Sequence, residues 1–248
     1  MEDANQKNSP VYKRVILKLS GEALRSNRRI TIDPEIVGKI ADEIQEIRTL
    51  GVEIGIVIGG GNIFRGFSAS ARGMDRVMAD HMGMLATIIN SIALQDFFIS
   101  RGMPTRVMSA IRLESMAEFY IRRRALNHLI NGNIVVFAAG TGNPYFTTDT
   151  AAALRASELD ADAIIKGTKV DGVYSDDPVK VKNAKKYDVI SYDDVIRKNL
   201  RVMDATAITL CRENNIPIVV CKLLEKGNLK GVVMGQNIGT IVKGETND

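Results

Sequence analysis

The chain has 248 residues, of which 45% are hydrophobic and 25% are charged. These ordinary values exclude a disordered or collagen-like chain and fit a globular protein with a full core. Lys and Arg outnumber Asp and Glu by 33 to 29, and this mild net charge of +4 suits anionic small molecules as partners. We expect no nucleic-acid partner, because the aromatic residues that stack on bases make up only 5% of the chain. The one dense basic run, residues 122–124, is better explained as a solvated helix face or a subunit contact.

Apolar runs such as residues 134–139 and 216–221 are far shorter than the roughly 18 residues that span a bilayer, so no membrane segment is expected. The first ten residues are polar and lack the apolar core of a signal peptide. We expect a flexible N-terminal arm over residues 1–10 and one domain over residues 11–248. Two cysteines cannot by themselves form a disulfide framework or a four-ligand zinc site, and the expected location is a reducing cytoplasm. Two histidines leave little for histidine-based metal or triad chemistry.

Apolar, β-branched runs predict strands, in chain order, at residues 15–19, 52–58, 105–109, 133–139, 163–166, 216–221 and 238–242. Helical periodicity predicts a helix from Asp33, as N-cap, to Gly51, and further helices over residues 75–100, 114–130, 147–159 and 204–214. The second helix carries an apolar stripe that we interpret as core packing, formed by Met78, Met82, Leu85, Ile88, Ile89 and Ile92. Residues 170–188 are predicted to be an irregular, mobile loop.

The alternation of strands and helices predicts an α/β fold, with an open and mostly parallel sheet covered by helices on both faces. Ligands of such sheets bind at the carboxyl ends of the strands. The loops that follow the strands are therefore where functional residues are expected.

The first such loop begins with Lys18 at the end of a buried strand. This lysine either extends to solvent or meets an anion above the edge of the sheet, and the residues leave both readings open. Ser20 and Gly21 follow it and allow backbone N–H groups to face the same anion.

The second loop has three consecutive glycines, Gly59 to Gly61, followed by Arg65. Glycines lack Cβ atoms, so a phosphate or sugar can approach the backbone closely, and an arginine can bind phosphate oxygens through two donors. Phe64 breaks the G-x-G-x-x-G dinucleotide pattern, and no G-x-x-x-x-G-K-[ST] motif occurs in the chain. A classical dinucleotide-binding or P-loop function is therefore excluded.

The third loop, residues 140–149, combines flexible backbone with four hydroxyls and one amide. Thr147 or Thr148 caps the helix that follows. Asp149 then either interacts with the helix dipole or orients a lysine near bound phosphates, and this loop alone does not decide between the two. A fourth loop follows Lys166, another lysine at a strand end.

Together the four loops indicate a site for two phosphorylated groups. Phosphoryl transfer depends mainly on positioning and positive charge, so no histidine or cysteine nucleophile is needed. An acceptor that is itself a phosphate needs no general base, because its second pKa is near 6 and it is a dianion at neutral pH.

At these loops the sequence closely resembles the bacterial uridylate (UMP) kinases of the amino acid kinase superfamily. The resemblance extends from about residue 11 to residue 242. It is carried by KLSGEAL (18–24), VIGGGNIFRG (57–66), DHMGMLAT (80–87), AGTGNPYFTTD (139–149) and TKVDGVYSDDP (168–178). The resemblance implies transfer of the γ-phosphoryl group of ATP to UMP, giving ADP and UDP for pyrimidine nucleotide (CTP/UTP) biosynthesis. It also implies Mg²⁺ bound with ATP, an amino acid kinase fold that is a three-layer α/β/α sandwich, and a homo-oligomer that is a hexamer built from dimers.

The resemblance also implies roles for individual residues. The catalytic residues would be Lys18, Arg65 and Asp149. ATP would be bound by Lys18, Leu19, Ser20, Gly21, Gly61, Arg65, Thr168, Tyr174 and Asp177. UMP would be bound by Gly60, Asp80, Thr141, Gly142, Asn143, Pro144, Tyr145, Phe146, Thr147 and Thr148, with Asp80 on the ribose and Asn143 near the phosphate. Asp204 resembles an acidic position near the reacting centre, and the resemblance assigns no direct metal ligand.

The sequence departs from the family pattern at residues 26–31. The family often has a glycine-rich segment here that is linked to activation by GTP, whereas this chain reads SNRRIT. Arg28 and Arg29 can still attract a triphosphate, but the resemblance does not carry GTP activation or UTP inhibition to this chain.

Two other functions stay open at this point. The first is a superfamily enzyme that phosphorylates an acidic amino acid or carbamate, whose acyl phosphate product hydroxylamine would trap. The second is a non-catalytic nucleotide-binding regulator, which would bind ATP or UTP without turnover. Retention of Lys18, Arg65 and Asp149 argues against the regulator, because a pure binder needs no transition-state cations.

Overall fold

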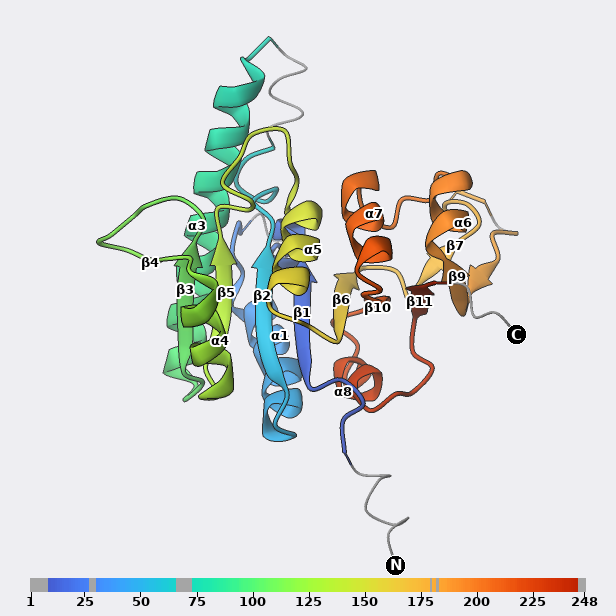
Figure 1. The fold of residues 1–248 in the computed structure, drawn as a ribbon, viewed down its shortest axis with the longest axis horizontal. Helices are drawn as coiled ribbons and strands as arrows, with labels where there is room; N and C mark the ends of the chain where they lie inside the picture. The colour runs from blue at the N-terminus through green and yellow to red at the C-terminus, as the bar shows by residue number, and fades with distance from the viewer. Residues whose placement is uncertain (1–8, 27–29, 66–72, 179, 182, 245–248) are drawn as a thin grey trace, which may run out of the picture.

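The computed structural model describes residues 9–26, 30–65, 73–178, 180–181 and 183–244. Nine of its strands form one sheet in the order β4-β3-β5-β2-β1-β6-β10-β11-β9 (Figure 1). These strands are β1 (Arg14–Leu19), β2 (Glu53–Ile58), β3 (Thr105–Ser109), β4 (Glu118–Phe119), β5 (Ile134–Ala138), β6 (Ala163–Thr168), β9 (Val189–Ser191), β10 (Ile218–Lys222) and β11 (Thr240–Lys243).

All neighbouring strands of this sheet are parallel except β10 and β11, which are antiparallel. The central strand β1 has β2 on one side and β6 on the other. The chain continues from β1 toward β2, β5 and β3 in one direction and from β6 toward β10 in the other, so the order reverses between β1 and β6. A reversal of this kind opens a crevice at the carboxyl ends of the two strands.

Helices cover both faces of the sheet and bury two hydrophobic clusters against it. One face carries α1 (Pro34–Thr49), α3 (Arg76–Ser100) and α8 (Asn228–Val233). The other face carries α4 (Arg122–Ile130), α5 (Thr148–Glu158), α6 (Tyr192–Arg197) and α7 (Ala205–Glu213). This arrangement confirms the predicted α/β fold with a mostly parallel central sheet between two helical layers.

Local sequence signals account for most helix starts. The Asp33 carboxylate accepts a hydrogen bond from the Glu35 N–H at 2.9 Å and caps α1, with Pro34 in the first turn, as predicted. Side chains of Asp75, Thr147 and Asp204 cap α3, α5 and α7 in the same way. The last two caps matter for the site, because they fix the first turns of helices that lie near the carboxyl ends of β1 and β6.

The predicted core packing of the α3 stripe is wrong for most of its members. Ile88 is buried, but Met78, Met82, Leu85 and Ile89 are between 42% and 53% exposed. The 25 residues of α3 extend roughly 37 Å, about twice the length of a strand of five or six residues. Its N-terminal half therefore continues beyond the ends of the strands, as Figure 1 shows. The apolar side chains of the stripe on this half stay exposed for that reason.

Other differences concern short elements. The predicted helix over residues 114–130 begins only at Arg122, after the two-residue strand β4. The predicted irregular loop contains a hairpin of β7 (Val173–Tyr174) and β8 (Lys186–Tyr187). The short elements β9, α6 and α8 were not predicted, and neither was the single-turn 3₁₀ helix η2 (Gly21–Leu24). The predicted arm is outside the described residues except for Ser9 and Pro10, as are residues 27–29 of the segment that departs from the family pattern.

Candidate active site

Two lysines lie side by side at the carboxyl ends of the central strands. Lys18 of β1 and Lys166 of β6 are direct partners in the parallel register. Ile16 and Ile164, two residues earlier, belong to the cluster on the α5 face, so the period of two along each strand directs both lysines toward that face. Two ammonium groups in this arrangement repel one another unless an anion lies between them.

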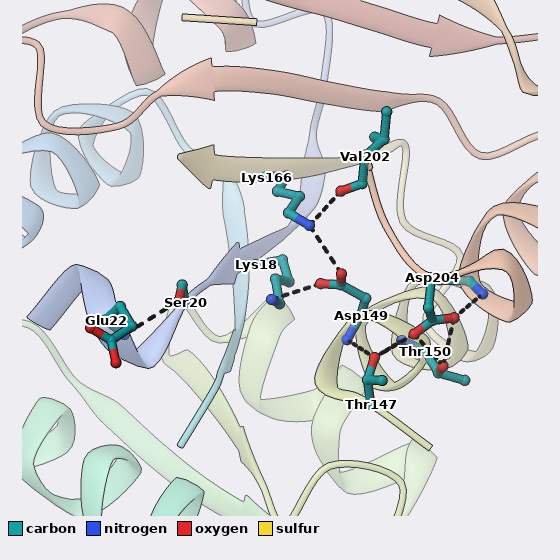
Figure 2. A network of polar contacts seen from close by, with 10 residues as sticks. Lys18, Ser20, Glu22, Thr147, Asp149, Thr150, Lys166, Val202 and Asp204 are labelled. Carbon is teal, nitrogen blue, oxygen red and sulfur yellow. Dashed lines mark hydrogen bonds and ion pairs between the residues drawn. The ribbon is translucent and has the colours of Figure 1, made fainter. Parts of the chain in front are cut away.

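Asp149, in the first turn of α5, supplies that anion (Figure 2). The Lys18 Nζ lies 2.6 Å from its Oδ1, and the Lys166 Nζ donates to its Oδ2 at 3.0 Å. Among the described residues, Oδ1 has no hydrogen-bond partner beyond this ion pair with Lys18. The carboxylate therefore joins two cations that start from neighbouring strands.

Burial and charge act in opposite directions on this triad. Burial alone would raise the pKa of Asp149, but the ammonium groups of Lys18 and Lys166 outweigh it and lower that pKa from its ordinary value. Burial lowers the pKa of Lys166, and Lys18 lowers it further, against the opposing effect of Asp149. Lys166 also donates a hydrogen bond to the Val202 carbonyl. Asp149 is thus ionised at neutral pH and favours the charged form of Lys166.

Asp204 holds the start of α5 in place (Figure 2). Its carboxylate accepts hydrogen bonds from the hydroxyls of Thr147 and Thr150, and it caps α7 by accepting from the Ala207 N–H at 2.8 Å. The Thr147 hydroxyl in turn accepts from the Asp149 N–H at 3.0 Å. Through Thr147, Asp204 fixes the turn that aims Asp149 at the lysines, which gives this acidic position a supporting role.

The glycine loop packs tightly against the turn that follows Lys18. A Cβ atom on Gly21 would lie 2.4 Å from Asn62 Oδ1 and 2.6 Å from the Gly59 carbonyl oxygen. A Cβ atom on Gly60 would lie 2.8 Å from the Ala86 Cβ in α3, whereas one on Gly61 would meet nothing closer than 3.8 Å. Close packing of the protein thus requires glycine at positions 21 and 60, whereas a Cβ atom on Gly61 would make only ordinary van der Waals contacts.

A reciprocal pair of amides fixes the glycine loop to the long helix. Asn90 of α3 donates to the Gly59 carbonyl and to Asn62 Oδ1, each at 2.8 Å, and Asn62 donates back to Asn90 Oδ1 at 2.9 Å. Asn90 is fully buried and Asn62 nearly so. One turn earlier, the Thr87 hydroxyl accepts from the Ala139 N–H at the start of the third loop. Helix α3 therefore holds both loops.

Arg65 extends back to the turn after β1. Its Nη2 lies 2.8 Å from Glu22 Oε1, and its Nε donates weakly to the Gly61 carbonyl at 3.4 Å. Glu22 lies within η2, directly after Gly21. Arg65 thus lies against the short helix that follows β1, in contact with a residue four positions after Lys18.

A cavity of about 200 Å³ lies beside the glycine loop and α3. Seven of the predicted UMP residues line it: Gly60, Asp80, Thr141, Asn143, Phe146, Thr147 and Thr148. Three predicted residues do not line it: Gly142, which packs against Ala110 at a positive φ, and Pro144 and Tyr145. The Tyr145 N–H still donates to Asp80 Oδ2 at 2.8 Å, so this tyrosine supports the wall of the cavity from outside.

A second cavity, of about 650 Å³, lies beyond β6. It is lined by the predicted ATP residues Thr168, Tyr174 and Asp177, together with Lys166 and the segment from Lys198 to Val202. Thr147 and Thr148 of the first cavity directly precede Asp149, and Lys166 of the second cavity binds Asp149. The triad therefore lies between the two cavities.

Several residues at this centre were not assigned roles from the sequence. Lys166 was recognised only as a lysine at a strand end, and the β1–β6 register is what brings it to Lys18. Glu22, Arg76 and the Asn62–Asn90 pair gave no signal of their own. Leu19 was predicted to bind ATP, but its side chain is fully buried in the core, so only its backbone is available to a ligand.

Neither cysteine is suited to act as a nucleophile. Burial raises the pKa of both Cys211 and Cys221 to about 12, so neither thiol is ionised at neutral pH. Within the described ranges, no group of three or more His, Cys, Asp or Glu side chains is arranged to hold a metal ion. The polar groups that the site offers are lysine and arginine cations, carboxylates, backbone amides and hydroxyls.

A crevice at a strand-order reversal, with paired lysines between two cavities, defines an α/β protein built to bind two anionic ligands next to one another. A sequence model of the amino acid kinase family matches residues 13–222. The chain belongs to this family, which confirms the resemblance seen in the sequence.

Solved structures give a narrower comparison. The chain is similar to UMP kinase from Bacillus anthracis, with 44% identity, a TM-score of 0.91 and coverage of 95% of this chain and 97% of that one. UMP kinase from Ureaplasma parvum is 39% identical, with a TM-score of 0.86 and coverage of 93% and 98%. Uridylate kinase from Archaeoglobus fulgidus is 30% identical, with a TM-score of 0.70 and coverage of 92% and 99%.

Proposed function

We propose that the protein is a UMP kinase, which transfers the γ-phosphoryl group of ATP to UMP and yields ADP and UDP for pyrimidine nucleotide biosynthesis. The observation that carries the proposal is the Lys18–Asp149–Lys166 triad between two cavities. The similarity along nearly the whole chain to proteins named UMP kinase supports the choice of acceptor. Neither the amino acid or carbamate kinase nor the non-catalytic regulator is favoured by these observations.

ATP occupies the larger cavity in this proposal, with its nucleoside beside Thr168, Tyr174 and Asp177 and its phosphates directed toward the triad. UMP occupies the smaller cavity, with its ribose at Asp80 and its phosphate near Asn143. The backbone of residues 19–21 and of Gly61 then faces the donor phosphates. This assignment brings donor and acceptor together at the carboxyl ends of β1 and β6.

Catalysis in this site is electrostatic. Lys18, Lys166 and Arg65 supply positive charge where the transferred phosphoryl group accumulates negative charge, and Asp149 keeps the two lysines together. The UMP phosphate is largely a dianion at neutral pH and attacks without a general base. Arg65 must leave Glu22, at least in part, to reach a phosphate.

Mg²⁺ is proposed as the cation that accompanies ATP. This ion usually keeps several water ligands and binds through substrate phosphates and one or two carboxylates. Asp149 and Asp204 fit only this kind of Mg²⁺ binding, in which phosphates and water supply most of the ligands, because their carboxylates already bind lysines and hydroxyls. The ion would be held chiefly by the nucleotide, where it would neutralise phosphate charge.

A homo-oligomer, a hexamer as in the sequence expectation, is also part of the proposal. The exposed face of α3 supports it, because Met78, Met82, Leu85 and Ile89 form an apolar surface that a second copy would cover.

Among the described helices, only α3 is long and apolar enough to cross a membrane by length and composition, and 44% of its most apolar stretch is buried. The buried Asn90 and Ser91 within it are typical of a core helix.

The cytoplasm is the proposed location, since two free cysteines fit a reducing compartment and the proposed substrates are cytoplasmic metabolites. GTP and UTP are proposed as effectors to be tested. Arg28 and Arg29, the arginines that can attract a triphosphate, are outside the described residues.

The proposed reaction is tested by incubating the protein with ATP, Mg²⁺ and each of UMP, CMP, AMP and GMP. ADP release should occur only, or chiefly, with UMP. Equal rates with CMP or AMP would refute the choice of acceptor, and trapping of an acyl phosphate by hydroxylamine would indicate an amino acid or carbamate kinase. Tight binding of ATP or UTP without turnover would indicate the regulator. Repeating the panel with GTP and UTP added measures the effector response.

A further inference from the structure

Arg76 opens α3 at the mouth of the smaller cavity, whose wall it shares with Asp80 and Asn143. Its Nε donates to Asp80 Oδ2 at 2.7 Å. Its guanidinium also lies over the Tyr145 ring, 5.5 Å from the ring centroid. One side chain thus contacts both the carboxylate in the cavity and the loop that closes it from the other side.

Helix stability does not explain an arginine at this position. A cation in the first turn opposes the helix dipole, which favours negative charge there. The order of the pair, with the cation four residues before the anion, is also the weaker of the two orders. Arg76 therefore needs another explanation, and the cavity beside it provides one.

The two oxygens of Asp80 have different surroundings. Oδ2 accepts from both Arg76 Nε and the Tyr145 N–H. Among the described residues, none donates a hydrogen bond to Oδ1. This oxygen is also not one of the side-chain atoms that are buried without a partner, so it is accessible from the cavity that Asp80 lines. The carboxylate cannot rotate without losing both donors to Oδ2. It is held with one oxygen occupied and the other available to a ligand.

Tyr145 depends on the same contacts. Its φ of +72° is a conformation that residues other than glycine rarely adopt, so the surrounding structure must compensate for it. The N–H bond to Asp80 and the Arg76 guanidinium over its ring are the compensating contacts that the structure contains. Arg76 thereby connects the start of α3 to the third loop.

We propose that Arg76 is a positioning residue of the acceptor site, which orients Asp80 so that its Oδ1 accepts hydrogen bonds from the two hydroxyls of the ribose. The inference rests on the proposed function, in which the acceptor is a ribonucleoside monophosphate. Arg76 also neutralises the Asp80 carboxylate, which would otherwise repel the dianionic phosphate of the acceptor. The arginine acts through Asp80 and Tyr145 and does not take part in the transfer itself.

The test compares R76M and R76K with wild type and with R112M, using UMP and 2′-deoxyUMP as acceptors. Arg112 is a matched control, because it also pairs with a carboxylate, Glu114, and lies over a ring, Phe119, outside both cavities. We expect R76M to raise the KM for UMP about tenfold, as for a weakened hydrogen bond to a charged group. The kcat and the KM for ATP should stay within about twofold of wild type, R76K should fall between, and R112M should match wild type.

The deoxynucleotide separates positioning from a general structural role. A nucleotide without the 2′-hydroxyl forms one hydrogen bond fewer to Asp80, so misorientation of Asp80 weakens its binding less. R76M should therefore raise the KM for 2′-deoxyUMP only about threefold. An unchanged KM for UMP in R76M, an equal rise for both nucleotides, or an equal rise in R112M would each overturn the inference. Wild-type turnover of UMP in the same assay reports separately on the proposed function, and only the ratios of variant to wild type report on Arg76.

Discussion

Replacement of Asp149 by asparagine tests the electrostatic reasoning about the triad. Asn has the shape of Asp but no charge, so D149N leaves the ammonium groups of Lys18 and Lys166 together without their anion. Both lysine side chains are largely buried, at 9% and 17% exposure, and they are direct partners in neighbouring strands. Their repulsion is then uncompensated in a partly dehydrated crevice.

The size of the effect follows from this burial. Removal of one partner from a buried ion pair costs about 3–5 kcal/mol. Because some solvent reaches all three side chains, we expect the lower end, about 3 kcal/mol off the free energy of unfolding near neutral pH. For a chain of this length that corresponds to a melting temperature about 6–12 °C lower. The kcat should fall as well, since the lysines are no longer held together.

The lowered pKa of Asp149 predicts how the stability difference between wild type and D149N changes with pH. The pKa of Asp149 is lower in the folded protein than its ordinary value, so its stabilisation is complete above about pH 4 and is lost as the pH falls through the folded pKa. The stability gap between wild type and D149N should therefore be constant near neutrality and shrink in acid. At alkaline pH the gap should also narrow, because without Asp149 the already lowered pKa of Lys166 decreases further and that lysine loses its charge.

Urea denaturation of both proteins at a series of pH values measures this gap. D160N is a matched control, because Asp160 pairs with Arg122 on the surface and such exposed pairs contribute at most about 1 kcal/mol. A D149N protein as stable as wild type at neutral pH, or a gap that does not change with acid, would refute the view that Asp149 compensates two buried cations.

Three further predictions concern other parts of the site. Arg65→Ala should lower kcat by on the order of 10²–10³ with an unchanged melting temperature, and a near-normal kcat in steady-state assays would remove Arg65 from the chemistry. Gly21→Ala should cost about 1–3 kcal/mol of stability, because its Cβ would lie 2.4 Å from Asn62 Oδ1, whereas Gly61→Ala should melt at the wild-type temperature. Met82→Glu should lower the particle mass in light scattering by dissociating the proposed oligomer, and a wild-type monomer would contradict that proposal.

Much of the fold could be predicted from local patterns. Buried β-branched runs and capping residues such as Asp33 placed the long elements within a few residues, because these signals act over one or two turns of chain. The two-residue strands, together with α6 and α8, were missed, since elements this short depend on the tertiary contacts around them. The stripe on α3 was assigned to the core because an apolar pattern predicts that a helix face is buried without showing against what, and four of its side chains are exposed in this chain.

The candidate site could be predicted in part. The loops after the strands were identified by their unusual residues, and the sheet topology brings them to one edge. The partners of Asp149 could not be derived from that loop, because they depend on the register between β1 and β6. The spacing of Arg76 and Asp80 is visible in the sequence, but the contact of Arg76 with Tyr145 joins positions that only the folded chain brings together.

The attachment of two loops to one helix has a consequence for how the smaller cavity can move. Asn90 holds the glycine loop and Thr87 holds the beginning of the third loop, and both side chains are buried on the same rigid helix. Both segments line the smaller cavity, so a displacement of α3 would carry that part of its wall as a unit relative to the lysines on the sheet. Contact of another molecule with the exposed side of α3 would therefore move one cavity relative to the lysines without reshaping the wall that α3 holds.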